Sequence, residues 1–476
     1  MIIRGGERAA RWLLDAWRTL SLDAKVVGTI AVANWLLLFA NHTTVAATRD
    51  ETIWRLFPGV AGPAFLAAAG IVAFSYPFRD RRQGASFTPS GRWLHLGLIV
   101  AVFVVVPTVA SIVLRETGKP YTYVHDGALM IEEAARKLLA GHNPYATDYL
   151  DTPLYYWPMV NNPALYHLTY FPFLFLVTVP FVWAFDHLGI FWDQRYLYLP
   201  AFVATLATLP LLVKRTDHRI ALVALVGLNP QLFPFVIEGR NDFFVLLFLC
   251  AGVALLQRER RAWASLAIAA AAAAKLHALF LLPFLAIYLI ATRKPTSVRD
   301  GLRALALTLP ALAFLGLTFV PFLVNDWNAF YDDVVRYNAG GAAWTYPISG
   351  MGFSALLLWL GAIEYRQADF PFAAIEIAVA TPIALYTLAR LWRTPTIATM
   401  LTGYGLTLLA FLFFGRYFQG NYLGYILAVA SPVPLLMREA RPARAVRRRR
   451  AQIAERAPQP VPSVGAATAG DARSVE

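Results

Sequence analysis

The chain has 476 residues, of which 58% are hydrophobic and only 15% are charged, and this composition is too apolar for a water-soluble protein of its length. Its formal net charge is +13, but Lys and Arg gather in short loops and in the C-terminal tail, as the positive-inside rule predicts for cytoplasmic segments, so nucleic acid is not needed to explain the charge. The single cysteine, Cys250, excludes a disulfide framework or a cysteine metal cluster within one chain. We expect an all-α, polytopic transmembrane helical bundle.

The N-terminal part is expected to hold a cytoplasmic segment and two membrane spans. The first apolar run, residues 26–47, is long enough to cross a hydrocarbon core of about 30 Å, and no signal-peptide cleavage site follows it. The next two runs, 56–78 and 93–114, flank an Arg-rich loop, which places that loop in the cytoplasm. The segment that begins at Arg115 should therefore face outside.

Residues 115–170 are predicted to form a large external loop, rich in Tyr, Pro and Asn, with one amphipathic helix at 127–140. The next apolar stretch, 171–185, is short and contains two prolines. Only one crossing can precede the cytoplasmic Lys/Arg cluster that follows. We therefore expect 171–185 to be re-entrant or interfacial and 196–213 to be the true span.

Charge clusters also predict the rest of the path. Residues 220–237 and 243–256 form an exit and a return around an external turn. The alanine-rich run 262–291 has cytoplasmic clusters at both ends, so it is predicted to be a hairpin with its apex near Lys275 and His277. The remaining predictions are a span at 304–324, a second external loop at 325–350, a surface segment at 353–363, and spans at 370–388, 397–414 and 422–437.

This topology gives three regions. Residues 1–92 form the cytoplasmic N-terminus with two extra spans, residues 93–437 form the membrane catalytic module, and residues 438–476 form a polybasic, disordered tail against anionic lipid. Both termini are expected in the cytoplasm of a multi-pass cell-membrane protein. The candidate site then faces the periplasmic or extracellular side.

Polar residues concentrate in five separated segments on the predicted external face. Ionisable groups at membrane depth cost about 2.5 to 3.5 kcal/mol each on insertion scales and usually face a cavity. We therefore expect a site at the outer leaflet. The segments are HDGALMIEEAARKLLAGHNPY from His125, EGRND from Glu238, KLH from Lys275, YDDVVRYN from Tyr331 and GRYFQGN from Gly415.

Asp126 is the candidate for proton transfer. It precedes a helix in the external loop, where a carboxylate could take a proton from a sugar hydroxyl. The structural alternative is an N-cap, because Asp is a preferred capping residue and Glu132 and Glu133 suit the N-terminal half of a helix. On spacing alone the cap is favoured.

For the other candidates, the sequence is compatible with both a binding role and a structural role. Lys275, with His277 beside it, could grip a lipid phosphate or could snorkel to the interface. Asn241 and Asp242 could line a site or cap the next helix. Arg336 and Arg416 lie in loops where ion pairs with solvent-exposed partners are common.

Several cofactor patterns are absent from the sequence. There is no Gly-rich phosphate loop, no HExxH helix and no zinc-type Cys/His spacing, so we expect no cofactor, and a divalent metal has no supporting motif. The Tyr and Trp residues of the first external loop could stack on sugars, but interfacial belts are rich in the same residues.

The chain resembles the GT-C superfold of polytopic glycosyltransferases, above all the bacterial mannosyltransferase-like branch that uses polyprenyl-phosphate sugars. The resemblance covers roughly 93–294 and rests on three stretches: the segment from His125, with Asp126, Gly141, Pro144 and Tyr145; NPALYHLTYFPFLFL from Asn162; and EGRNDFFVLLFLCAGVALLQRERRAWASLAIAAAAAAKLHALFLLPF from Glu238.

The resemblance implies an inverting transfer of mannose, another hexose or a pentose from a polyprenyl-phosphate donor to a glycan or glycolipid acceptor. It implies Asp126 as catalytic base. Substrate binding would fall to Lys275, His277, Asn241, Asp242, Arg336, Arg416 and Tyr145.

Two departures from the family pattern stand out: two spans precede the usual first one, and Arg240 stands where relatives often have glutamine. A lipid-linked glycan polymerase or ligase, and a lipid or solute transporter, are the alternative functions.

Overall fold

The computed structural model describes residues 15, 17–40, 60–159 and 162–440. The chain divides into two units, residues 1–436 and 437–476, and all helices and strands that carry a label below lie in the first. Of the second unit the structure describes residues 437–440, which are helical. Most of the predicted tail therefore lies outside the described residues, and the predicted boundary at residue 93 stays a prediction.

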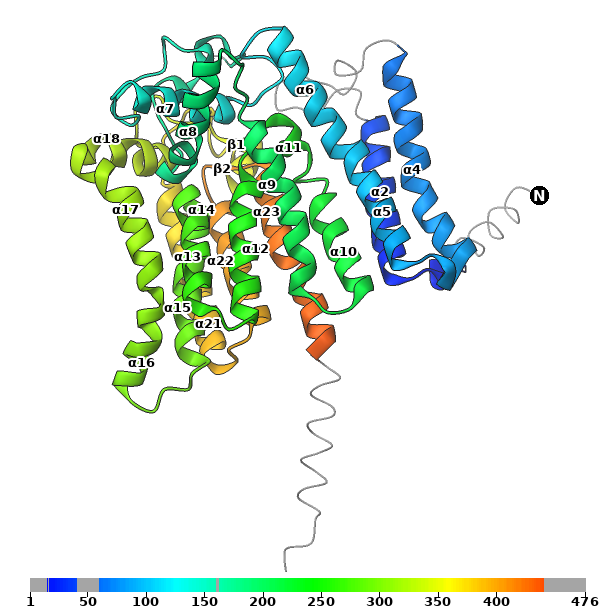
Figure 1. Cartoon of the computed structure of the whole chain (residues 1–476). Coiled ribbons are helices and arrows are strands. Elements are labelled where there is room, and N and C mark those ends of the chain that lie inside the picture. The colour runs from blue at the N-terminus through cyan, green and yellow to red at the C-terminus, as the bar shows by residue number, and fades with distance from the viewer. Residues whose placement is uncertain (1–14, 16, 41–59, 160–161, 441–476) are drawn as a thin grey trace, which may run out of the picture. The chain divides into compact units, whose positions relative to one another are not determined.

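The first unit is an all-α bundle (Figure 1). Among the described residues, six helical segments are long and apolar enough to cross a membrane, and this indicates a multi-pass membrane protein. The predicted all-α membrane bundle is confirmed at this level. The six segments are Ala61–Ser86, Pro89–Thr117, Arg195–Leu212, Val298–Asn325, Phe372–Arg393 and Gly420–Ala440.

The first helices are joined through a buried arginine. Arg92 Nη1 lies 2.7 Å from Asp23 Oδ2, its other terminal nitrogen pairs with Asp80, and the Tyr76 hydroxyl donates to Asp23 at 2.8 Å. Arg92 therefore bonds three helices together instead of standing free in a loop. These are α2 (Leu22–Ala40), α4 (Ala61–Gln83) and α5 (Pro89–Val100), and α5 continues through a π turn at Ala101–Val105 into α6 (Val106–Thr117). Residues 41–47 of the predicted first span lie outside the described residues.

Helix α7 (Asp126–Leu139) lies within one residue of the helix predicted at 127–140. It begins after His125, the N-cap, and Gly141 adopts a φ of +84° two residues after its end. α7 packs on α8 (Pro172–Leu188), a helix of 17 residues that also contacts α13 and α17. Its predicted re-entrant or interfacial placement stays a prediction.

The span predicted at 220–237 is wrong as one continuous helix. α10 (Thr216–Gly227) ends well before α11 (Pro234–Glu238). The break follows from Pro230 and Pro234, which cannot continue a backbone hydrogen-bond ladder. The Asn229 side chain accepts from the Gln231 amide and donates to the Gly424 carbonyl, and these bonds hold the broken segment. α9 (Arg195–Thr208), with the turn Leu209–Leu212, precedes the break, and α12 (Asp242–Gln257) follows it.

The alanine-rich run turns back on itself at Lys275, as the charge clusters predict. α13 (Arg261–Ala274) ends there, and Lys275 is extended, with φ −154° and ψ 137°, before α14 (Leu276–Leu279) and α15 (Leu281–Ala291). Arg261 and Arg293, near the two ends of the run, line one surface hollow. The predicted hairpin is confirmed.

The C-terminal half completes the bundle and closes over one end of it. A two-stranded parallel sheet pairs Ser349 with Tyr417. Gly350 has a φ of +89°, and a Cβ at this position would lie 2.0 Å from the Phe418 carbonyl oxygen, so only glycine fits there. The elements are α16 (Val298–Leu305), α17 (Leu309–Asn325), α18 (Trp327–Tyr331), a π turn η7 (Asp332–Arg336), α19 (Tyr337–Ala339), β1 (Ser349–Gly350), α20 (Phe353–Trp359), α21 (Phe372–Arg393), α22 (Ile397–Phe413), β2 (Tyr417–Phe418) and α23 (Gly420–Ala430).

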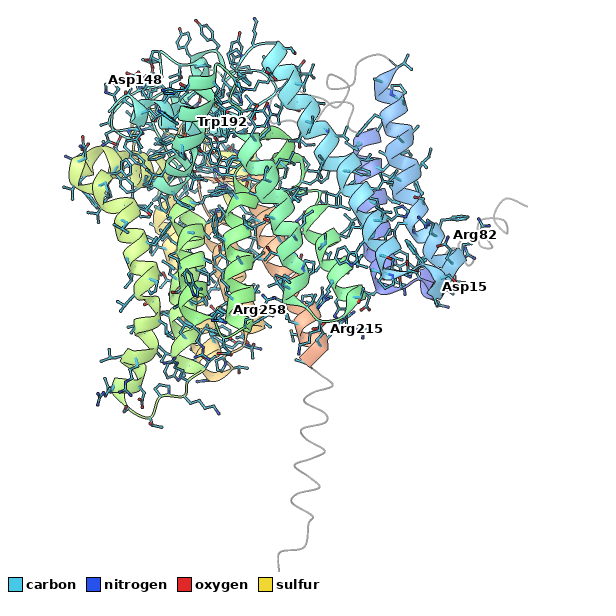
Figure 2. All side chains as sticks on the ribbon, in the orientation of Figure 1. Asp15, Arg82, Asp148, Trp192, Arg215 and Arg258 are labelled. Carbon is cyan, nitrogen blue, oxygen red and sulfur yellow. The ribbon has the colours of Figure 1, made fainter. Side chains whose placement is uncertain are left out.

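The two ends of the bundle differ. α7, α11, β1 and β2 gather at one end (Figure 1). Figure 2 shows Asp148 and Trp192 at that end, whereas Arg215 and Arg258 lie at the other.

Candidate functional site

A cavity of about 390 Å³ lies where the predicted polar segments meet. It is formed by the N-terminus of α7, the α11–α12 turn, the break at Lys275, the segment from η7 to α19, the first turn of α21 and the α22–α23 connection. Segments from residue 125 to residue 422 therefore contribute to one site. Of the residues singled out in the sequence, it is lined by Asp126, Asn241, Lys275, His277 and Arg416.

Asp126 is the first residue of α7, and its neighbour His125 is the N-cap, so the structure does not give Asp126 the capping role. His125 Nδ1 lies 2.7 Å from Asp126 Oδ1 and 3.0 Å from the Gly127 amide nitrogen. That nitrogen can donate to Asp126 or accept from Gly127, but not both, so the pair has two hydrogen-bonding states. A Cβ at Gly127 would come 2.1 Å from the Tyr170 hydroxyl, so glycine is required beside Asp126.

The charge on Asp126 is favoured by its neighbours. Burial alone would raise the pKa of this carboxyl, but His125 and then Arg240 lower it below the usual value. Asp126 is therefore ionised at neutral pH. An ionised carboxylate at a cavity wall can accept a proton from a bound hydroxyl.

Arg240, the departure from the family pattern, joins two walls of the cavity. Its Nε donates to Glu238 at 2.9 Å, and its Nη1 donates to Gln419 at 2.9 Å and to Asn421 at 3.3 Å. Its guanidinium carbon lies 4.4 Å from the centre of the Phe235 ring. Arg240 thus fixes the α11–α12 turn against the α22–α23 connection.

Lys275 points into the protein and not towards the interface. Its Nζ lies 2.6 Å from Asp242 Oδ1, and Asp242 also accepts from the Asn421 side chain at 3.1 Å. Asp242 itself does not line the cavity and lies behind Lys275. Asn241 does line it, and although Asn241 stands at the N-cap of α12, its side chain makes no capping hydrogen bond.

His277 lines the cavity with a buried ring nitrogen, Nε2, that is available for a hydrogen bond. The residue is 4% exposed, and its Nε2 has no partner among the described residues. Its ring lies 4.2 Å, centre to centre, from the Tyr425 ring. A buried polar atom without a partner costs free energy unless a ligand or water supplies one.

Arg416 is the lining cation without a carboxylate partner among the described residues. Its Nε donates to the Tyr346 carbonyl at 2.7 Å, and its terminal nitrogens donate to the carbonyls of Ala368 and Arg366 at 3.0 and 3.3 Å. The residue is 1% exposed, and this burial lowers its pKa. A guanidinium has five N–H donors, so two remain for a ligand. Gly340, with φ +90°, leaves the space that the Arg416 side chain fills.

Two predicted residues lie elsewhere. Arg336 is half-exposed, and it pairs with Asp332 at 2.7 Å and donates to the Gly341 carbonyl. Tyr145 is buried in an aromatic cluster, with its ring 4.9 Å from Phe330 and its hydroxyl donating to the Tyr170 carbonyl. Neither lines the cavity.

A clasp between the two long loops stands beside the cavity. His167 Nδ1 lies 2.7 Å from Asp333 Oδ1, and its Nε2 donates to the Ala343 carbonyl at 2.5 Å. With Asp332, these residues offer three ligand atoms within 4.8 Å of one another, as a metal site would. Both ring nitrogens of His167 are already engaged, so we interpret the group as a clasp. The Asp333 carboxylate and the Ala343 carbonyl raise the pKa of His167, against the effect of its burial.

Reasoning from the sequence missed two features of the lining. One is Glu376, which was assigned only to a span, although a lone carboxyl in an apolar run is itself a signal. The other is the convergence of tyrosines from four separate segments, which no spacing in the sequence connects, although Tyr170 is one of the loop aromatics considered above as sugar contacts. These are Tyr170, Tyr337, Tyr346, Tyr417 and Tyr422.

Compared with known proteins, the chain matches no protein-family model, no curated protein and no solved structure.

Proposed function

We propose that this protein is a membrane glycosyltransferase that moves a sugar from a polyprenyl-phosphate donor to a hydroxyl of a glycan or glycolipid acceptor. One observation carries the proposal. An ionised carboxylate, Asp126, and a buried cation, Arg416, which has no carboxylate ion-pair partner among the described residues, line the same cavity among apolar helices. The first suits a proton acceptor, and the second suits an anionic leaving group.

Arg416 is the proposed main contact of the donor phosphate. Among the described residues its hydrogen-bond partners are backbone carbonyls and no carboxylate forms an ion pair with it, so this buried cation gains from an incoming anion. Guanidinium groups also bind phosphate oxygens in a two-pronged manner. Lys275 has a weaker claim than the sequence implied, because Asp242 already neutralises it. His277 Nε2 is a second proposed contact.

The chemical step follows from these assignments. Asp126 accepts the proton of the acceptor hydroxyl as that oxygen attacks the anomeric carbon of the donor sugar. The bond between the anomeric carbon and the phosphate oxygen breaks, and its electron pair leaves with the polyprenyl phosphate. Arg416 stabilises the charge that develops on the phosphate, and attack from the opposite face inverts the anomeric centre.

The prenyl chain needs an apolar exit from the cavity. The part of the cavity lining formed by α7, α14 and η7 is apolar and is the proposed exit. Its residues are Met130, Leu276, Val334 and Val335. Val335 is 44% exposed, so this wall reaches the surface of the chain. A chain leaving there would pass beside α8.

The test is a transfer assay with purified protein in lipid nanodiscs. Radiolabelled polyprenyl-phosphate mannose, glucose and arabinose are each offered with a membrane glycolipid extract. Labelled glycolipid should form from at least one donor, with release of polyprenyl phosphate. Transport of the intact donor between leaflets without any cleavage would favour the transporter and contradict the proposal.

A further inference from the structure

Glu376 is a carboxyl in an unusual place. It is the only acidic residue of α21, an otherwise apolar helix that is long enough to cross a membrane. An ionisable side chain within such a helix costs about 2.5 kcal/mol or more on insertion scales, and it usually faces a cavity or a polar partner. Glu376 does line the cavity that holds Asp126 and Arg416.

The fold gives Glu376 no partner within the part of the chain that the structure describes. No hydrogen bond or ion pair reaches its carboxyl, whereas Asp126 contacts His125 and Asp242 contacts Lys275. A Cβ on Gly415 would lie 2.3 Å from Glu376 Oε1, so the glycine at position 415 leaves room for the carboxyl group. The cavity wall therefore has space for the Glu376 carboxyl group but offers it no hydrogen-bond or ion-pair partner among the described residues.

The surroundings of Glu376 are aromatic and apolar. Tyr346 and Tyr417 line the same cavity with ring centres 5.0 Å apart. The Tyr346 hydroxyl accepts a hydrogen bond from Gln419 and the Tyr417 hydroxyl donates one to Asn338, and the two ring faces offer further contact surface.

The wall beside Glu376 is apolar and reaches the surface of the chain. It consists of Ala373 and Ile377 from α21 and Phe411 and Leu412 from α22. Ile377 is 61% exposed although it lines the cavity, so the cavity has a second mouth at α21.

These features together match a sugar carrying an apolar group. A carboxyl group exchanges hydrogen bonds with adjacent sugar hydroxyls, aromatic faces pack against sugar C–H groups, and the apolar mouth accommodates an alkyl chain. We propose that the α21 mouth is a binding subsite for the saccharide headgroup of a glycolipid, in which the Glu376 carboxyl forms hydrogen bonds with its hydroxyls. That this glycolipid is the acceptor rests on the proposed function, but the binding itself does not.

The first test is binding of soluble probes in the absence of any donor. n-Octyl α-mannoside and n-octyl β-glucoside, below their micelle-forming concentrations, are titrated into protein in nanodiscs by calorimetry. At least one should bind the wild type. Glu376→Ala should weaken that binding about tenfold or more, as expected for losing the hydrogen bonds of the carboxyl group to the sugar, and Glu376→Gln, which keeps a hydrogen-bonding group there, should weaken it less. Glu364→Gln, a change at an exposed glutamate outside the cavity, is the matched control and should bind as the wild type does.

Two binding results would overturn the subsite. One is equal affinity for wild type and both Glu376 variants. The other is failure of both glycosides to bind the wild type, including the case where n-octylamine binds instead, which would assign Glu376 to a cationic ligand. Because no donor is present, a protein that fails to transfer sugar can still pass this test.

A second measurement uses wild-type protein and avoids any folding defect of the variants. Dicyclohexylcarbodiimide, which enters membranes and adds to carboxyl groups, should modify Glu376 from the α21 mouth, and the modified peptide is identified by mass spectrometry. Saturating n-octyl glycoside should reduce labelling at Glu376 severalfold, while labelling at Glu364 stays unchanged. Undiminished labelling of Glu376 would contradict the proposal.

Discussion

Two groups of buried charges lie close together in this protein, and they are built in opposite ways. Behind α7, Arg115, Glu132, Asp193 and Arg195 form a network in which each charge has an opposite partner. In the cavity and among the described residues, Arg416 forms hydrogen bonds with carbonyls, Glu376 has no partner and His277 keeps an open nitrogen. The first group is satisfied within the fold, whereas the second keeps hydrogen-bonding capacity that we propose a ligand uses.

The network behind α7 is closed. Arg115 binds both oxygens of Glu132, at 2.9 and 2.7 Å, and contacts Asp193 at 2.8 Å. Arg195 binds both oxygens of Asp193 and donates to the carbonyls of Tyr123 and Ile237. All four side chains are at most 1% exposed, so no ligand can reach them. The network connects α6, α7 and α9, and thereby positions the helix that begins with Asp126.

The largest predicted effect is the loss of stability when one charge of this network is removed. Arg115→Met leaves Glu132 and Asp193 buried with too few partners, which should cost about 3 to 5 kcal/mol of stability. Thermal unfolding in detergent should show a large fall in Tm or no folded protein. Arg303→Met, at an exposed ion pair, should leave the Tm near that of the wild type. An unchanged Tm for Arg115→Met would show that the network is not structural.

Arg416 should behave in the opposite way. Arg416→Lys keeps the charge but loses the forked donors, and Arg416→Met loses both, so donor affinity should fall about tenfold and about a hundredfold, respectively. Binding of a fluorescent polyprenyl-phosphate sugar to nanodisc protein measures the change. Full donor affinity in folded Arg416→Met protein would remove Arg416 from the site.

Lys275 shares a property with each group, because it lines the cavity and also has a carboxylate partner. Lys275→Met should lower the Tm, since Asp242 then keeps only Asn421, and it should weaken donor binding by less than Arg416→Met does. Adding Asp242→Asn removes the unpaired charge and should restore most of the Tm. If the double variant also regains wild-type donor affinity, Lys275 is a structural residue alone.

The clasp of His167 predicts a smaller, pH-dependent effect. The pKa of His167 is raised in the folded state, so its contribution to stability is complete below the unfolded value of about 6.5 and is lost as pH rises through the folded value. The Tm should therefore fall as pH rises above about 6.5. His167→Gln should have a flatter profile above that pH, and an identical slope in both proteins would contradict the clasp.

The sequence carried the pattern of apolar runs and charge clusters, and these depend on local composition. They predict helices at most of the observed places, and they predict the turn at Lys275. The broken segment after α10 was missed because two prolines outweigh an apolar run there. Convergence of Asp126, Asn241, Lys275, His277 and Arg416 was expected, but their partners were not. The Lys275–Asp242 pair joins residues 33 positions apart, the Arg115–Asp193 pair joins residues 78 positions apart, and no local pattern encodes such contacts.

The most direct test of the account compares Asp126→Asn with the wild type in one preparation. Asp126→Asn protein should keep wild-type donor affinity and a Tm close to that of the wild type, because His125 rather than Asp126 caps α7. Sugar transfer should fall by at least about a hundredfold, the usual contribution of a general base. Transfer near the wild-type rate by folded Asp126→Asn protein would contradict the assignment of Asp126 as the base.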